Sequence, residues 1–253
     1  MYAMAPEYTG KGDARLTIQL LWGGKPKQGR GRTPELSVDR IVDAGIALAD
    51  REGLDAVSMR RVAQELGGGT MSLYRHVPGK GELLDLMFDR AVAESLDVPA
   101  VEGGWRARLE ALAWQSWHVY HRHPWLLQIS AARPPLGPGV LDSYHVLLAA
   151  VDGIGLSGAE MNATVTLVAD FVAGSARRAI EAAQVEEGTG ESDEVWWSDR
   201  STFWEEYFDA ERYPIIARIY EEGGYEEAQD AGFAYGLARV LDGIQSWLDF
   251  KRA

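Results

Sequence analysis

The stretch that decides the fold is SMRRVAQELGGGTMSLYRHVPGKGELLDLM, residues 58–87. It contains two short helical patterns joined by glycines, and a third helix follows at once. Ser58 is a good N-cap, because its hydroxyl can accept a hydrogen bond from an unpaired amide of the first turn. Residues 67–69, all glycine, end the first helix, since glycine readily takes the left-handed conformation of a C-cap. Pro78 and Gly79 end the second helix.

The second helix, residues 71–77 with Thr70 as its cap, is too short to bury much. Leu73 and Val77 are spaced to face inward. The side chains left facing outward are those of Thr70, Met71, Ser72, Tyr74, Arg75 and His76. Hydroxyls and a tyrosine can contact phosphates, and an arginine can read a guanine edge in the major groove. We therefore predict a helix-turn-helix with residues 71–77 as its recognition helix. The alternative is an ordinary helical hairpin with a polar outer face.

The run GLDAVSMRRVAQELGGGTMSLYRHVPGKGELLDLM, residues 53–87, resembles the DNA-binding module of the TetR family of transcriptional repressors. VDRIVDAGIALADRE, residues 38–52, resembles that family's first helix, and the LYRHV-x-x-K-x-ELLDLM part is highly specific. The resemblance implies phosphate and base contacts at Ser58, Arg60, Thr70, Met71, Ser72, Tyr74, Arg75, His76 and Lys80. The chain departs from the family at Gly68 and Gly69, where a branched apolar residue and a small one are more usual. This departure affects the expected rigidity of the turn and the direction in which the Thr70 side chain points.

Composition narrows the class of protein. The 253 residues suffice for a small domain and a larger one with its own core. Because the chain has no cysteine, it can hold no disulfide, thiolate zinc site or cysteine nucleophile. No apolar run approaches the roughly 18 residues of a membrane span, and the N-terminus lacks the apolar core of a signal peptide. We expect a cytoplasmic protein without membrane contact, metal or cofactor.

The net charge of −13 is unevenly distributed. Residues 25–81 hold ten basic and seven acidic side chains, whereas residues 101–253 hold twelve basic and twenty-four acidic ones. This asymmetry fits a small DNA-reading head on an acidic body. The same acidic body argues against an architectural protein that wraps DNA.

Residues 1–33 are expected to form a flexible extension. Residues 1–13 have no periodicity, and residues 15–22 are apolar enough to pack as a short helix on the body or on a partner. GGKPKQGRGRTP, residues 23–34, is a basic arm that could follow phosphates or enter the minor groove. A solvated linker is an equally good interpretation of this arm.

Every long segment after the head has a helical period. The head itself spans residues 34–96, and its last helix is expected at 82–96. The body spans residues 97–253, with helices expected at 105–121, 125–132, 140–153, 157–184, 201–222 (broken at Pro214) and 226–250. Ser157 and Glu160 form a capping box for the fourth of these. We predict an all-α protein of about nine or ten helices, with a three-helix helix-turn-helix domain and a larger C-terminal bundle.

The last helix carries glycines on one stripe, at Gly232, Gly236 and Gly243. Glycine inside a helix costs about 1 kcal/mol relative to alanine, so the stripe needs a compensating close contact. The 157–184 helix offers a matching small-residue surface that includes Ala173 and Gly174. We expect these helices from two chains to form a four-helix homodimer interface, as the resemblance also implies. Close packing within one protomer is the alternative.

Aromatic residues mark the first body helices. Trp114, Trp117 and His121 share one helical face. The stripe is either core packing or one wall of an apolar pocket for a small molecule. Asp170 is the polar ligand-contact candidate, although a structural network with Arg177 is the stronger interpretation. These four residues, Trp114, Trp117, His121 and Asp170, are the candidate ligand-binding set.

An enzyme is the competing class. His118, His121 and His123 lie close in sequence, but no further ligand stands at metal-binding spacing. The glycines at 67–69 lack the lysine of a phosphate loop. We therefore expect a homodimeric, ligand-responsive regulator, most simply a repressor of a near-palindromic double-stranded DNA operator, released by a small-molecule inducer. A small-molecule-binding or metal-dependent helical enzyme, or a ligand-independent DNA-binding protein, is the alternative.

Overall fold

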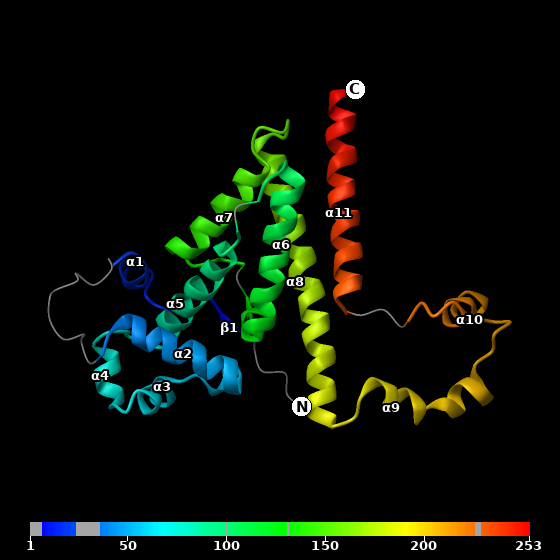
Figure 1. Ribbon diagram of the computed structural model, residues 1–253. Helices are drawn as coiled ribbons and strands as arrows, with labels where there is room; N and C mark the ends of the chain where they lie inside the picture. The colour runs from blue at the N-terminus through cyan, green and yellow to red at the C-terminus, as the bar shows by residue number, and fades with distance from the viewer. Residues whose placement is uncertain (1–6, 24–35, 100, 131, 226–228) are drawn as a thin grey trace.

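The computed structural model describes residues 7–23, 36–99, 101–130, 132–225 and 229–253, and it confirms the all-α prediction (Figure 1). A small head of helices lies at one side of a larger body, and a long helical arm leaves the body at the other. Of the basic stretch 23–34, all but Gly23 lies outside the described residues. Among the described helices, none is long and apolar enough to cross a membrane.

The head consists of α2 (Val38–Glu52), α3 (Met59–Glu65) and α4 (Thr70–Tyr74). Ser37 caps α2 by accepting a hydrogen bond from the Arg40 amide, and Gly53, with φ of 83°, ends it. A 3₁₀ turn at Leu54–Ala56 leads into α3. The head core is built from fully buried aliphatic side chains such as Ile41, Leu48 and Val62.

Helix α5 (Lys80–Ala93) connects head and body and continues into a 3₁₀ turn, η2 (Glu94–Leu96). Most of its side chains are buried, because α2 packs on one side of it and α7 on another. Its start follows α4 directly, whereas its end reaches the body (Figure 1). The sequence predicted one helix over 82–96; the structure starts it at Lys80 and tightens its last turn.

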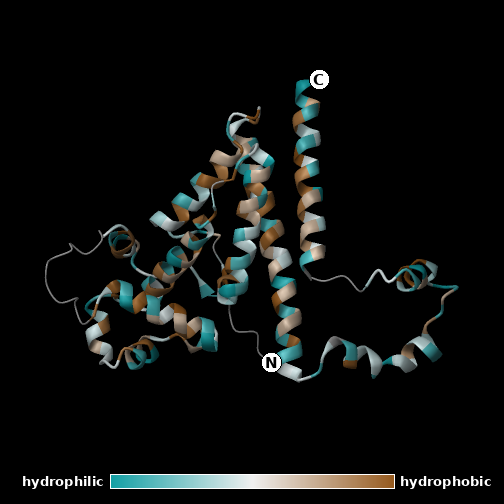
Figure 2. Ribbon diagram, in the orientation of Figure 1, coloured by the Kyte–Doolittle hydropathy of each residue, from teal (hydrophilic) through white to brown (hydrophobic). Residues whose placement is uncertain are grey.

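The body is built around α6 (Trp105–Arg122), α7 (Pro138–Ala150), α8 (Gly158–Thr189) and α11 (Gln229–Arg252). The predicted capping box at the start of α8 is present. The interior faces of α6, α8 and α11 form a second core. Apolar and polar residues alternate along α8 and α11, as expected for helices with one buried side (Figure 2).

The segment between α8 and α11 leaves the body as an arm (Figure 1). It contains α9 (Asp193–Ser198), a π-helical turn at Phe203–Tyr207 and α10 (Pro214–Glu221). The helix expected over 201–222 with a break at Pro214 is present in two parts, 201–207 and 214–221, and the break lies at residues 208–213, directly before Pro214. Pro214 starts α10, because proline fits the first helical position, where no amide is needed.

The N-terminal extension corrects the sequence expectation. Residues 7–13 were expected to have no regular structure, but Glu7–Tyr8 form a strand, β1, parallel to β2 (Ile129–Ser130). The short helix predicted at 15–22 is present as α1 (Ala14–Trp22) and packs along α5. The helix expected at 125–132 is replaced by a 3₁₀ helix, η3 (Pro124–Gln128), followed by β2. Two-residue strands carry no alternating pattern that the sequence could reveal.

Candidate DNA-reading surface and ligand cavity

The turn between α3 and α4 has the geometry of a helix-turn-helix. The Ser58 side chain accepts a hydrogen bond from the Arg61 amide at 3.2 Å, as an N-cap should. Gly67, with φ of 66°, ends α3 in the left-handed region, and the Gly68 amide donates to the Ala63 carbonyl at 2.9 Å. Gly69, rather than Thr70, occupies the N-cap position of α4. The two glycines that depart from the family pattern therefore shape the turn directly.

Helix α4 separates buried and exposed side chains as predicted, although it ends at Tyr74 and not at residue 77. Leu73 and Val77 are fully buried, whereas Met71 is 75% exposed and Tyr74 is 44% exposed. Ser72 and Arg75 are also exposed, and Thr70 and His76 are half-buried at the edge of this surface. A helix held by so few apolar contacts, with a polar outer side, is suited to insertion in a groove.

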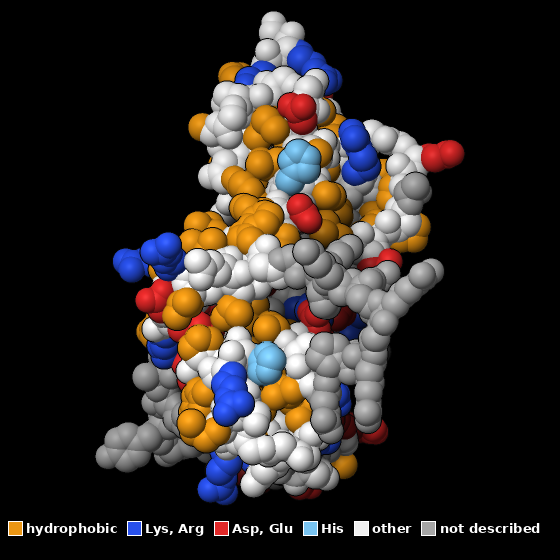
Figure 3. Space-filling model, turned by 90° about the vertical axis from the view of Figure 1, so that its left-hand side faces the viewer, with side chains coloured by type: hydrophobic (Ala, Val, Ile, Leu, Met, Phe, Trp, Pro, Cys, Tyr) orange, Lys and Arg blue, Asp and Glu red, His pale blue; other side chains and the backbone are white. Residues whose placement is uncertain are grey.

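The charged side chains around α4 differ in their partners. Arg60 and Arg75 are exposed, and among the described residues no carboxylate lies within ion-pair distance of either. Lys80, by contrast, is 3.1 Å from a carboxylate oxygen of Glu7 in β1. On the face shown in Figure 3, Lys and Arg side chains lie on the upper part of the molecule as well as on the lower part. Both arginines can therefore bind an anion directly, whereas Lys80 must first break its ion pair with Glu7.

A partly buried polar contact joins the head to the body. His123 Nδ1 donates to Asp50 Oδ1 at 2.7 Å, and the Trp125 indole N–H donates to the same oxygen at 2.7 Å. A carboxylate can only accept, so Nδ1 carries a proton. His123 Nε2 faces Glu94 Oε1 at 3.3 Å. We call Asp50, His123 and Trp125 the head–body joint, because Asp50 belongs to α2 and both donors follow α6.

A second polar feature fixes the start of α7. Both carboxylate oxygens of Asp89, on α5, accept hydrogen bonds from the amides of Gly139 and Val140 at 3.1 and 2.9 Å. Burial raises the pKa of Asp89 above its ordinary value, against the opposing effect of these two amides. A carboxylate at a helix N-terminus is also favoured by the helix dipole. Helix α5 is therefore tied to α7 through the end that lies in the body.

An inner cavity of about 130 Å³ lies where α5, α6, α7 and α8 meet. Its walls are mainly apolar, and its polar groups are the hydroxyls of Ser95, Ser116, Ser143 and Tyr120. The serine hydroxyls donate to backbone carbonyls or to one another, so their free lone pairs are acceptors. Burial raises the pKa of Tyr120, which keeps its phenol neutral. No charged side chain lines this cavity.

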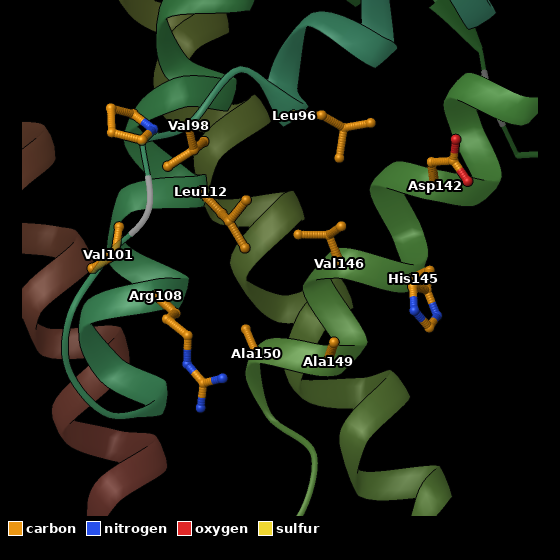
Figure 4. Close-up of a pocket in the computed structure, with 11 residues that line it drawn as sticks. Leu96, Val98, Val101, Arg108, Leu112, Asp142, His145, Val146, Ala149 and Ala150 are labelled. Carbon is orange, nitrogen blue, oxygen red and sulfur yellow. The ribbon is translucent and has the colours of Figure 1, made fainter.

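An outer cleft of about 560 Å³ lies beside it, between η2, the loop that follows, α6 and α7 (Figure 4). Leu96, Leu112 and Val146 form part of its apolar surface. Arg108 reaches into it from α6, and Asp142 and His145 border it on α7. Leu96, Leu112 and Val146 of the cleft are chain neighbours of the cavity residues Ser95, Ala113 and Leu147, so the two spaces lie close together.

The predicted ligand residues do not line either space. Trp117 stacks on Phe233 at 4.2 Å between ring centroids, and Trp114 meets the same ring edge-on at 4.7 Å. His121 packs on Trp117 and lies 2.9 Å from its carbonyl oxygen. This stripe is a solid contact between α6 and α11.

Asp170 differs from expectation, and the histidines near the end of α6 have separate partners. Asp170 is exposed on α8, and Arg177 donates to the Leu127 carbonyl at 2.7 Å instead of joining Asp170 in a network. His118 packs against Trp114 with the two rings tilted, while His123 belongs to the head–body joint. Within the described ranges, no three metal-binding side chains of His, Cys, Asp or Glu come together. The serine hydroxyls and the joint went unrecognised because nothing local in the sequence marks them.

Comparison with known proteins follows the same division into head and body. The sequence model described as "Bacterial regulatory proteins, tetR family" matches residues 41–87. The model described as "Tetracyclin repressor-like, C-terminal domain" matches residues 99–248. The first match runs from the first turn of α2 into α5, and the second runs from the loop before α6, through the arm, to the last part of α11.

Individual relatives extend over nearly the entire chain. The HTH-type transcriptional repressor DrrR1 of Streptomyces coeruleorubidus is 42% identical over 244 residues, covering 96% of this chain and 90% of that protein. The crystal structure of apo ActR from Streptomyces coelicolor superposes with a TM-score of 0.70 at 27% identity, covering 87% of this chain and all of that one. ActR in complex with actinorhodin gives a TM-score of 0.70 at 29% identity, over 85% of this chain and 97% of that one.

Proposed function

This chain belongs to the TetR family of bacterial transcriptional regulators, and from that premise we propose how it works as a ligand-released repressor. Two copies place α4 in successive major grooves of a near-palindromic operator. A small molecule in the body then moves α5 and separates the two reading helices from their half-sites. The observation that carries the proposal is the division of α4 into buried Leu73 and Val77 and exposed Met71, Tyr74 and Arg75.

The exposed side chains divide into two roles on DNA. Arg75 is free of carboxylates and stands at the end of α4, so it reads a base edge. Lys80 starts α5 and contacts a phosphate once it leaves Glu7. Met71 and Thr70 lie at the start of α4 toward the bases. The surrounding polar side chains, which position the head on the backbone, are Ser58, Arg60, Ser72, Tyr74 and His76.

The dimer forms through α8 and α11. Gly236 already contacts α8 within the protomer, because a Cβ there would lie 2.6 Å from Phe171. Gly174, Gly232 and Gly243 instead face open space. Glycines at these positions would allow a helix of a second chain to approach closely. The apolar side chains exposed on the same two helices include Leu167, Tyr235, Trp247 and Phe250. Two-fold pairing of this face would present both heads to one side of a DNA duplex.

The inducer site is the inner cavity, entered through the outer cleft. At about 130 Å³ the cavity is smaller than the roughly 300 Å³ of ordinary ligand pockets, so the ligand also occupies the cleft or widens the cavity. Val92 and Ser95, at the end of α5, belong to the cavity wall. A ligand that displaces them tilts α5 and the head at its other end. The complex of ActR with actinorhodin supports the proposal that a small molecule binds this chain, because ActR has a similar fold.

DNA binding is tested with three arginine or lysine variants of the full chain. A duplex is selected from random sequence with the wild-type protein, and binding is followed by fluorescence anisotropy at several salt concentrations. Arg75→Ala should lower the preference for the selected duplex over random DNA by about 1–3 kcal/mol. Lys80→Ala should weaken both duplexes alike and reduce the salt slope by about one. Arg218→Ala, an equal charge loss on α10, is the control. Identical behaviour of the first two variants would contradict these roles.

Induction is tested with actinorhodin as the probe. The predicted result is release of the selected duplex, with the probe and the duplex weakening each other's binding by the same factor. Ser116→Leu fills the inner cavity and should abolish the response without changing DNA binding, whereas Ser198→Leu, at the exposed end of α9, should leave the response intact. Equal probe affinity with and without DNA would refute the switch.

A further inference from the structure

The structure assigns a positioning role to residues 7–22, which we call the N-terminal strap. We propose that the strap holds α5, and with α5 the DNA-reading head, at a fixed angle to the body. Only the consequence for DNA binding rests on the proposed function. The mechanical claim concerns a single protomer.

One end of the strap is attached to the body. Strand β1 pairs in parallel with β2, with Glu7 opposite Ile129 and Tyr8 opposite Ser130. The Thr9 hydroxyl donates to the Arg133 carbonyl at 2.7 Å, and Thr9 is 7% exposed. Strand β2 directly follows η3, which carries Trp125 of the head–body joint. This attachment is therefore made to a part of the body that already contacts the head.

The middle of the strap is attached to the first half of α5. The Gly10 amide donates to Asp85 Oδ1 at 2.9 Å, and the Asp13 amide donates to Glu82 Oε1 at 2.8 Å. Both carboxylates are buried, with Asp85 1% and Glu82 6% exposed. Buried carboxylates need hydrogen-bond donors, and Asp85 and Glu82 each accept a hydrogen bond from a strap amide. The α5 surface is thus matched to the strap in detail.

The other end of the strap returns to the body. Helix α1 lies along α5, and its Leu20 and Leu21 pack against the head core. At the end of α1, the Trp22 indole N–H donates to the Leu136 carbonyl at 2.7 Å, in the loop before α7. The strap therefore runs from the body, across the first half of α5, and back to the body.

This path limits how far α5 can tilt. The second half of α5 is tied to α7 through Asp89. Without the strap, the first half would be held to the body mainly by the head–body joint on α2. With the strap, it is braced at two separate places. A ligand that tilts α5 must bend or shift the strap as well.

Two glycines mark where the strap and α5 touch. A Cβ on Gly81 of α5 would lie 2.9 Å from the Gly12 amide nitrogen and 3.3 Å from its Cα. A Cβ on Gly12 would lie 2.4 Å from Glu82 Oε1. Gly81→Ala and Gly12→Val therefore break one contact from opposite sides. Gly158→Ala, at the start of α8 with open space around it, adds the same methyl without a clash and is the matched control.

The test uses the full chain and two readouts. Because the chain has no cysteine, Asp55→Cys in the head and Glu110→Cys in α6 can carry spin labels, and both sites are exposed. Labelled chain is diluted into excess unlabelled chain, and the head-to-body distance distribution is measured by pulsed electron resonance. Hydrogen exchange of residues 7–22 reports whether the strap is seated, since exchange follows local opening.

We expect Gly81→Ala and Gly12→Val each to speed strap exchange about tenfold or more and to widen the distance distribution about twofold. The double variant should do no more than either single one, because both remove the same contact. Gly158→Ala should match the wild type. A detached strap with an unchanged distribution would overturn the proposal. Unchanged hydrogen exchange of the strap in both variants would also overturn the proposal, because it would mean that the strap does not contact α5 at Gly12 and Gly81.

The DNA consequence is measured separately. A wider spread of head positions lowers the fraction of dimers that match both half-sites, so Gly81→Ala should weaken binding to the selected duplex about five- to tenfold. Glu7→Gln frees Lys80 while keeping the strap amides on α5, and it controls for release of that lysine. Absence of any DNA binding by the wild type would defeat the proposed function but leave the distance result standing.

Discussion

The head–body joint makes a measurable contribution to stability, and Asp50→Ala is the substitution that isolates it. Asp50 Oδ1 is the only oxygen that both joint donors share among the described contacts, at 2.7 Å from each. The donors are almost fully buried, with His123 3% and Trp125 1% exposed. Truncating Asp50 leaves two N–H groups that water can reach only from the Asp50 side.

The size of the effect follows from that geometry. A hydrogen bond to a charged acceptor contributes about 1.5–3 kcal/mol, so two of them set an upper limit near 6 kcal/mol. The Asp50 side chain is 30% exposed, which allows water to enter the vacated space and replace part of this. We therefore expect Asp50→Ala to lower the free energy of unfolding by roughly 2–3 kcal/mol. Asp50→Asn keeps an acceptor and should lose about 1 kcal/mol.

Urea denaturation at pH 7 and fixed protein concentration measures these differences, since dimerisation makes apparent stability concentration-dependent. Asp55→Ala, an exposed acidic residue of the same head, is the control. Trp125→Phe removes one of the two donors. Its effect on the free energy of unfolding should be about 1 kcal/mol smaller in the Asp50→Ala background than in the wild type, because the hydrogen bond is already lost there. Equal stability of Asp50→Ala and Asp55→Ala, within about 0.5 kcal/mol, would refute this account of the joint.

Three further outcomes are expected. Burial raises the pKa of Asp85 above its ordinary 3.8, so the folded state loses stability as pH rises through that pKa. The free energy of unfolding of Asp85→Asn, measured by urea titration, should therefore increase relative to that of the wild type from pH 3 to pH 7. Glu7→Gln should strengthen binding to random DNA and steepen its salt slope by about one, because Lys80 becomes available to phosphate. Hydrogen bonding to Lys251 and Ser157 lowers the pKa of Glu160 to about 2 from 4.5, so the deficit in melting temperature of Glu160→Gln should be full above pH 4.5 and vanish as pH falls toward 2.

The sequence predicted the head well because its signals are local. Ser58 as a cap, the glycines after α3 and the spacing of Leu73 and Val77 are each decided within a few residues. The bounds of α2 were predicted to the residue, and the capping box of α8 was recognised from Ser157 and Glu160. Helices whose ends are set by their own caps can be derived from sequence alone.

The strap and the cavity could not be predicted because their partners are distant in the chain. Strand β1 contacts residues more than a hundred positions away, and nothing in Glu7–Tyr8 itself favours a strand. The tryptophan stripe of α6 looks the same in sequence whether it faces a ligand or another ring. In the structure, Phe233 of α11 stacks on Trp117, so the stripe is part of the core and does not line a ligand site. Serines in the middle of α6 and α7 gave no sign that their hydroxyls surround a cavity.

Helix α5 is where the proposed ligand and DNA signals meet. Its 14 residues make a rigid rod of about 20 Å, with the inner cavity at one end and α4 at the other. A tilt of about 6° at the cavity end would move the α4 end by about 2 Å, and two-fold symmetry doubles the change in separation. Half-sites must lie about 34–36 Å apart, so such a shift is enough to misplace one reading helix. The strap holds the first half of this rod at Asp85, and the head–body joint holds α2, which packs on the rod, at Asp50. They therefore set how much ligand binding free energy is needed to move it, and loosening either should make the repressor easier to release.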